Sequence, residues 1–197
     1  MKAGYNRSGQ AYRRERKGDS RDVQLLSLLV EKLPKGAEVL DAGCGSGYPV
    51  AQLLARQFEV TGIDFSETQL RLAKRTVARV TLIQGDISVL PFRDETFDAI
   101  VSYYAIIHVP RDQHRELLLD FRRVLRAGGL VLLCMGAGDL PSDIGEFHGS
   151  KMFWSHYDRP TNLSLLKETG FNVLFSELAM DPEYPPSAHL FVLGSKR

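Results

Sequence analysis

The stretch EVLDAGCGSG at residues 38–47 decides the fold of this chain. A short apolar run that ends in Asp41 and glycines indicates a strand followed by a tight turn, because glycine adopts positive φ values without steric cost. Residues 50–57 then indicate a helix, whose first backbone N–H groups have no partner within the helix. The stretch therefore predicts a strand–turn–helix unit whose turn a ligand can approach closely.

Strand and helix patterns alternate on both sides of this unit. Such alternation predicts a mostly parallel sheet with helices on both faces. A short proline-rich link at 181–186 favours a hairpin over a helical crossover, so the last strand is expected to be antiparallel to its neighbour. We expect strands at 38–41, 58–63, 80–84, 97–102, 130–135, 171–177 and 188–194, and helices at 22–33, 50–57, 111–126 and 161–168, with another helix capped by Ser66.

Length and composition favour one α/β domain over residues 1–197. The chain has 197 residues, of which 44% are hydrophobic and 25% charged, with a net charge of +1. Such a balance gives no bulk attraction to nucleic acid or to a membrane surface. We find no apolar run of membrane-spanning length and no apolar core of a signal peptide. Cys44 and Cys134 lie in strand contexts and suit a reducing compartment, so we expect a cytoplasmic location.

Charge is concentrated at the start of the chain. Residues 1–21 hold seven basic and two acidic residues. This segment is either a solvated terminus or a lid over an anionic or carboxylate-bearing ligand.

Three carboxylates end three successive predicted strands. Ligands of open α/β sheets bind beyond the carboxyl ends of the strands. Asp64 is placed to accept both ribose hydroxyls of an adenosine, and Asp86 to accept the adenine amine, with the Ile87 backbone amide facing the ring. Together with Asp41, these acids would repel a pyrophosphate and attract a cationic sulfonium.

The glycine turn does not fit the common nucleotide-binding patterns. After Gly43 and Gly45, Tyr48 stands where the dinucleotide pattern has its third glycine. No Gly-Lys-Ser/Thr follows, so the phosphate-loop pattern fails as well. An NAD-dependent oxidoreductase is therefore the weaker alternative.

Four segments in order resemble the class I S-adenosylmethionine-dependent methyltransferases over nearly the whole chain, especially the small-molecule, quinone-biosynthesis-like type. They are VLDAGCGSG (39–47), VTGIDFSETQL (60–70), LIQGDISVLPFRDETFDAIVS (82–102) and VLRAGGLVLL (124–133). The resemblance implies a Rossmann-like seven-stranded sheet with the last strand antiparallel. It also implies S-adenosylmethionine as cofactor, S-adenosylhomocysteine as product, and methyl transfer by direct displacement.

The resemblance further implies which residues contact the cofactor. Tyr12 resembles the N-terminal tyrosine that many such enzymes fold over it. The other implied contacts are Asp41, Gly43 and Gly45 on the methionine side, Asp64 at the ribose, Phe65 against the adenosine, Asp86 and Ile87 at the adenine, and Ser102 and Tyr103 at the methyl-transfer face.

Two segments bear on the methyl acceptor. Residues 102–109, SYYAIIHV, lack the Asn/Asp-Pro-Pro-aromatic motif of enzymes that methylate exocyclic amines of bases or amides. This absence favours small-molecule O-, N- or C-methyltransferases. Residues 145–157 contain Phe153, Trp154 and Tyr157, and we expect an irregular loop there that either lines an acceptor pocket or covers the sheet edge.

Three histidines are candidate general bases, which the reaction needs only for a hydroxyl or an acidic carbon. His108 follows the fourth strand, and His148 and His156 lie in the aromatic segment. Structural hydrogen bonds are the alternative explanation for each. Their spacing does not suit a metal site, so no metal is expected.

The expected partner is a small-molecule methyl acceptor rather than a nucleic acid or a membrane, with a monomer or homodimer as the default. Two alternatives stay open. One is an RNA or protein methyltransferase that uses the basic N-terminus, and the other is a cofactor-binding, methyltransferase-like protein without turnover.

Overall fold

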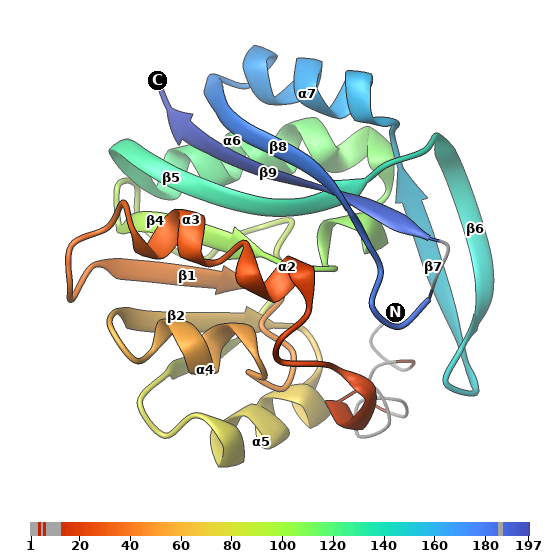
Figure 1. Ribbon diagram of the computed structural model, residues 1–197, viewed down its shortest axis with the longest axis horizontal. Helices are drawn as coiled ribbons and strands as arrows, with labels where there is room; N and C mark the ends of the chain where they lie inside the picture. Colours follow the sequence, from red (N-terminus) through yellow and green to blue (C-terminus); the bar gives the residue numbers. More distant parts are fainter. Residues whose placement is uncertain (1–3, 5, 7–12, 185–186) are drawn as a thin grey trace.

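Parallel strands around β1 (Glu38–Ala42) form the centre of the sheet (Figure 1). The computed structural model describes residues 4, 6, 13–184 and 187–197. β1 is parallel to both neighbours, with Asp41 beside Gly62 of β2 and Val101 of β4. The strand order is β3-β2-β1-β4-β5-β9-β8. The other strands are β2 (Glu59–Asp64), β3 (Thr81–Gln84), β4 (Phe97–Ser102), β5 (Leu125–Gly136), β8 (Phe171–Met180) and β9 (Ala188–Lys196).

β9 runs antiparallel to both β5 and β8. The expected seven-stranded, mostly parallel sheet with an antiparallel last strand is therefore confirmed.

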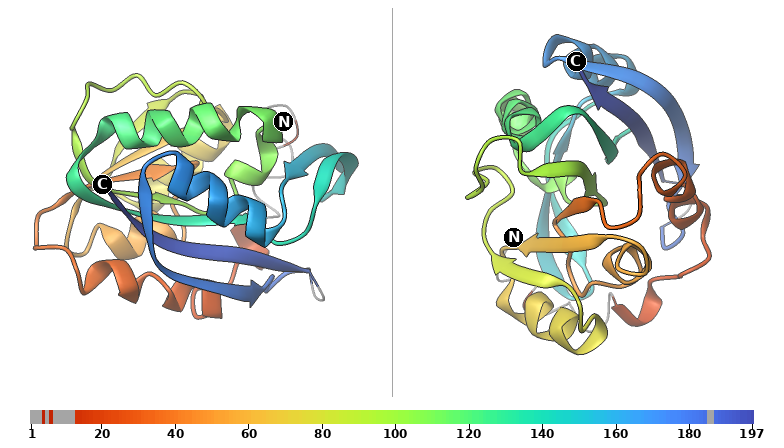
Figure 2. Two further views of the ribbon diagram at one scale, coloured as in Figure 1. Left: turned by 90° about the horizontal axis from the view of Figure 1, so that it is seen from above. Right: turned by 90° about the vertical axis from the view of Figure 1, so that its left-hand side faces the viewer.

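Helices cover both faces of the sheet (Figure 2). Side chains alternate along each strand, so Leu40 packs in one core with Phe121 of α6, and Val39 packs in the other with Leu54 of α4. The helices are α2 (Arg21–Gln24), α3 (Ser27–Val30), α4 (Val50–Leu54), α5 (Glu67–Thr76), α6 (His114–Val124) and α7 (Arg159–Glu168), with short 3₁₀ turns η1 (Ile106–His108) and η2 (Arg111–Gln113). The predicted cap of α5 is present, because the Gln69 backbone N–H donates to Ser66 Oγ over 3.2 Å.

Several predicted helix boundaries were wrong, and the helix expected at 50–57, for example, ends at Leu54. The helix expected at 22–33 is divided, because Leu26 N–H bonds to Val23 O, three residues back, at 3.1 Å. The helix expected to reach residue 126 ends at Val124, because Leu125 already pairs with Phe97 of β4.

The prediction of an irregular loop at 145–157 was also wrong. The segment belongs to an antiparallel hairpin of β6 (Leu140–Phe147) and β7 (Ser150–His156). His148 and Gly149 connect the strands with φ values of 47° and 71°, which is the left-handed backbone of a two-residue hairpin turn. The hairpin projects at the edge where the parallel strands end (Figure 1).

None of the helices in the described part of the chain is both long enough and apolar enough to cross a membrane.

Candidate active site

A cavity of about 380 Å³ lies at the carboxyl ends of the central strands. The glycine turn after β1 forms part of its wall, and the residues that follow β2 and β3 form another part. The predicted cofactor residues in this wall are Asp41, Gly43, Gly45, Asp64, Phe65, Asp86, Ile87 and Tyr103. The fold therefore brings together eight positions that the sequence places on four separate segments.

Asp64 joins two of the turns that build this cavity. Its Oδ2 accepts the Gly45 N–H at 3.0 Å, and its Oδ1 accepts the Ser66 N–H at 2.8 Å. Burial raises the pKa of Asp64 to about 6, although both backbone hydrogen bonds lower it. The carboxylate thus fixes the glycine turn against the start of α5 and still faces the cavity.

Asp41 is the second buried acid of the cavity, with 2% of its surface exposed. Its Oδ2 has no hydrogen-bond partner among the described residues. Burial, together with the negative charge of Asp64, raises the pKa of Asp41 to about 7. A positively charged group in the cavity would stabilise both carboxylates in their ionised forms.

The turn after β3 provides a third acid, which is exposed. Asp86 Oδ1 accepts the Ser88 N–H at 2.8 Å, an arrangement that holds the carboxylate at the start of the loop. Ile87 beside it is buried and gives the same part of the cavity an apolar surface.

Ser102 does not occupy the position that the resemblance implies. It is fully buried, its hydroxyl donates to Ala42 O at 2.8 Å, and it is not part of the cavity wall. The hydroxyl instead ties the end of β4 to β1. Tyr103 does line the cavity, and its hydroxyl donates to Asp22 O at 2.9 Å. Tyr12 lies outside the described residues.

The sequence reasoning missed a charged cluster at the cavity. Arg16 is buried, lines the cavity and forms an ion pair with Asp22, which is also buried. The Arg16 guanidinium lies over the ring of Tyr104, with Cζ 5.0 Å from its centroid, and Tyr104 Oη donates to Asp22 Oδ2 at 3.1 Å. The only sequence signal was the basic run at 1–21, which does not distinguish Arg16 from its solvated neighbours.

A second cavity of about 500 Å³ adjoins the first and shares Tyr104 and His108 with it. The β6–β7 hairpin and the link between β8 and β9 form its other walls. Its aromatic rings include Phe147, Trp154 and Tyr184. The hairpin thus lines the second cavity. The sequence had predicted an irregular loop in this position.

His108 lies in the wall between the two cavities. Its Nδ1 is 2.7 Å from Phe153 O, and since a carbonyl only accepts, Nδ1 carries the proton and Nε2 is the acceptor nitrogen. Burial lowers the pKa of His108 to about 4. The ring is therefore neutral at physiological pH.

The other two candidate histidines differ in position. His156 lines the second cavity, with Nδ1 2.7 Å from Gly138 O, and burial lowers its pKa. His148 lines neither cavity, because it is part of the hairpin turn, where Nε2 is 3.3 Å from Tyr184 Oη. The structure therefore separates His148 from the site in which sequence reasoning had placed it.

No cluster of three or more potential metal-ligating side chains occurs within the described part of the chain.

Residues 39–129 match the family described as methyltransferase domain. A demethylmenaquinone methyltransferase from Staphylococcus aureus is 36% identical over 104 residues, which cover 50% of this chain and 42% of that protein. The match thus spans less than half the length of this curated relative.

Two solved structures have a similar fold. A methyltransferase described as S-adenosylmethionine-dependent, from Methanosarcina mazei, superposes with a TM-score of 0.76 at 20% identity, covering 86% of this chain and 96% of that one. The 1,6-didemethyltoxoflavin-N1-methyltransferase of Burkholderia thailandensis, solved with bound 1,6-didemethyltoxoflavin and S-adenosylhomocysteine, superposes with a TM-score of 0.75 at 21% identity, covering 98% of this chain and 84% of that one. Residues 39–129 thus resemble a methyltransferase domain, and the chain has the fold of these solved methyltransferase structures.

Proposed function

We propose that this protein transfers the methyl group of S-adenosylmethionine to a small organic acceptor. The observation that carries the proposal is the pair of adjoining cavities that share Tyr104 and His108. One cavity has the carboxylates and glycine turn suited to the donor, and the other has aromatic walls suited to an organic ring. Their shared wall is where a methyl group would pass from donor to acceptor.

In this proposal the donor's cationic end lies by the buried acids. Asp64 accepts the ribose hydroxyls, since a carboxylate has about four acceptor sites and backbone N–H groups occupy two of them. Asp41 and the glycine turn hold the methionine portion, whose ammonium and sulfonium charges compensate the acids. Asp86 and Ile87 contact the adenine, and Phe65 packs against the adenosine.

Methyl transfer needs little more than alignment of donor and acceptor. The lone pair of the acceptor forms a bond to the methyl carbon while the carbon–sulfur bond breaks and its electron pair stays on sulfur. Orientation alone supplies up to about 7–11 kcal/mol in favourable cases. If the acceptor is a hydroxyl or an acidic carbon, His108 Nε2 accepts the proton that it loses. General-base catalysis contributes about 10²–10⁴-fold at a matched pKa, and the lowered pKa of His108 makes it a weaker base than an ordinary histidine.

The size of the second cavity supports a small molecule as the acceptor. Its volume of about 500 Å³ falls within the range of about 300–1,000 Å³ that is typical of small-ligand sites. The names of the Staphylococcus aureus relative and the Burkholderia thailandensis structure both specify small-molecule acceptors. An RNA or protein acceptor would have to place a single side chain or base in the same cavity.

Calorimetric titration with S-adenosylmethionine and S-adenosylhomocysteine tests the donor site. We expect the wild type to bind both and Asp64→Asn to bind at least about tenfold more weakly, since a hydrogen bond to a charged group contributes about 1.5–3 kcal/mol. Asp98→Asn is the matched control, because Asp98 also accepts a backbone N–H, from Glu38 at 2.8 Å, but at the opposite end of the sheet. Circular dichroism checks that both variants fold.

A screen for S-adenosylhomocysteine release with small organic acceptors tests turnover. Failure of the wild type to bind either donor ligand would overturn the proposal. Donor binding with turnover only on RNA or protein would overturn the small-molecule part alone.

A further inference from the structure

The second cavity has an unbalanced charge. Four carboxylates line it, whereas no lysine or arginine is among its described lining residues. The acids come from two separated parts of the chain that the fold brings together. They are Asp143 and Glu146 of β6, and Asp181 and Glu183 of the link between β8 and β9.

These acids are not equally paired. Asp181 is 3.2 Å from His189 Nε2, and it also accepts the N–H groups of Glu183 at 2.8 Å and Tyr184 at 3.1 Å. Glu183 has a buried Oε1 atom without a hydrogen-bond partner in the part of the chain that the structure describes. A buried polar atom without a partner is costly, so a ligand that donates a hydrogen bond to Oε1 would stabilise this half-buried side chain.

Charges of both signs act on Glu183, and the positive one is shared with another acid. Burial raises its pKa to about 7, Arg16 lowers it, and the nearby acids Asp181, Asp22 and Glu15 raise it again. The Arg16 guanidinium is itself ion-paired with Asp22.

Aromatic rings enclose the same cavity. Phe147 lies with its ring centroid 5.6 Å from that of Tyr184 and 6.2 Å from that of Trp154. Trp154 in turn lies 5.7 Å from the ring of His108. Flat ring faces favour a planar ligand, and their negative potential favours a cationic one.

We propose that the methyl acceptor is a planar nitrogen-containing ring compound that presents a positive charge or N–H groups to Glu183 while another of its atoms faces the donor. The proposal rests on the function proposed above. The nitrogen held by Glu183 is distinct from the methylated atom, because a protonated nitrogen has no lone pair with which to attack. In its neutral form, His108 Nε2 can accept a hydrogen bond from a second N–H or O–H group of the ligand, next to the atom that is methylated.

Matched pairs of fragments test the inference without knowledge of the true acceptor. Tryptamine and indole-3-acetate share one ring system with opposite charges, and benzamidine and benzoate form a second pair. Affinity is measured by calorimetry with and without S-adenosylhomocysteine. For the wild type we expect the cation of each pair to bind at least about tenfold more tightly, a free-energy difference of about 1.4 kcal/mol.

Glu183→Gln should remove this preference while keeping the shape of the side chain. Glu59→Gln removes the same charge from an exposed residue at the amino end of β2 and should leave the preference unchanged. Anions that bind as tightly as cations, no binding of either, or a preference that survives Glu183→Gln would each overturn the inference. Binding of S-adenosylhomocysteine is measured separately, so a failure of the donor site is distinguishable from a failure of this inference.

Discussion

At the scale of single residues, the shape of the first cavity depends on a glycine, Gly43, as well as on the buried acids. Gly43 follows β1 with φ of 85°, and a Cβ atom there would lie 2.3 Å from the Cβ of Ala105. The turn after β1 can therefore meet the segment after β4 only if this position is glycine.

Gly43→Ala should destabilise the protein by about 1–3 kcal/mol and weaken donor binding, because positive φ and the contact with Ala105 both oppose the new methyl group. Gly36→Ala is the control, since Gly36 has φ of 78° but a Cβ atom there would meet nothing within 4 Å. Urea denaturation and donor calorimetry measure both variants. Equal effects in the two would show that backbone strain alone, and not the contact, is important.

At the scale of elements, a second glycine allows the β6–β7 hairpin to pack closely against the sheet. Gly136 ends β5, and a Cβ atom there would lie 2.1 Å from Cγ of His156 in β7. The absence of a side chain lets β7 approach the end of β5 and form the wall of the second cavity.

Gly136→Ala should displace the hairpin, reducing fragment or acceptor binding while leaving donor affinity unchanged. Gly138→Ala is the matched control, because a Cβ atom at Gly138 has open space around it, with no neighbour within 4 Å. Calorimetry with S-adenosylhomocysteine and with the fragments separates the two cavities. A comparable loss of donor affinity in Gly136→Ala would contradict this division between elements.

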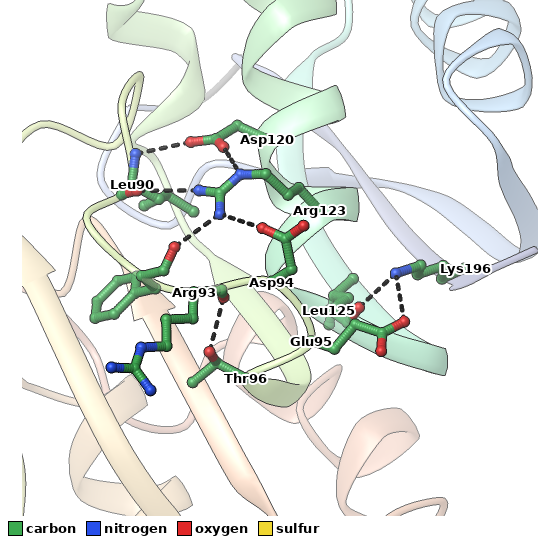
Figure 3. A network of polar contacts seen from close by, with 10 residues as sticks. Leu90, Arg93, Asp94, Glu95, Thr96, Asp120, Arg123, Leu125 and Lys196 are labelled. Carbon is green, nitrogen blue, oxygen red and sulfur yellow. Dashed lines mark hydrogen bonds and ion pairs between the residues drawn. The ribbon is translucent and has the colours of Figure 1, made fainter.

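A second element-level feature is the anchoring of the β3–β4 loop to α6 (Figure 3). Arg123 of α6 donates to Leu90 O at 3.1 Å and Phe92 O at 2.7 Å, and pairs with Asp94 at 2.9 Å and Asp120 at 2.7 Å. The loop that begins at Asp86, beside the first cavity, is therefore anchored by this guanidinium and by Asp120, which accepts the Leu90 N–H at 2.7 Å.

Arg123→Met should lower the free energy of unfolding by about 1–3 kcal/mol, since it leaves backbone carbonyls of the loop without their donor. Arg115→Met on the same helix removes one exposed ion pair, with Glu168, and should cost less than about 1 kcal/mol. Urea denaturation gives both values. A loss in Arg123→Met no larger than in Arg115→Met would show that the network does not anchor the loop.

At the scale of the whole molecule, the buried acids link folding to pH. The pKa of Asp41 is raised to about 7 and that of Asp64 to about 6, whereas both ionise near pH 4 in an unfolded chain. The folded state therefore binds more protons than the unfolded state between about pH 4 and 7. The contribution of these residues to stability falls as pH rises through this window, and cationic donor binding offsets the loss.

Asp41→Asn isolates this effect. Relative to wild type, the variant should become more stable as pH rises from 5 to 7.5, by at most about 1.4 kcal/mol per pH unit. Urea denaturation of both proteins at several pH values, without ligand, measures the difference. A difference that does not change with pH would mean that Asp41 ionises normally in the folded protein.

The sequence alone determined the mostly parallel sheet and much of the wall of the first cavity. Apolar strands, glycine turns and strand-end acids are local patterns, and parallel strands necessarily bring their carboxyl ends to one edge. The positions of Asp41, Asp64 and Asp86 at three strand ends were therefore enough to place them together. The end of α6 at Val124 was less readable, because pairing of Leu125 with the distant backbone of β4 decides it.

The second cavity was decided only by the tertiary structure. Tyr104, Trp154 and Glu183 are far apart in the chain and meet because the β6–β7 hairpin and the β8–β9 link fold over the same edge of the sheet. Burial of Arg16 and Asp22, and the raised pKa of Glu183, likewise depend on packing between segments. Desolvation and charge pairing arise from neighbours in space, which no local pattern of residues specifies.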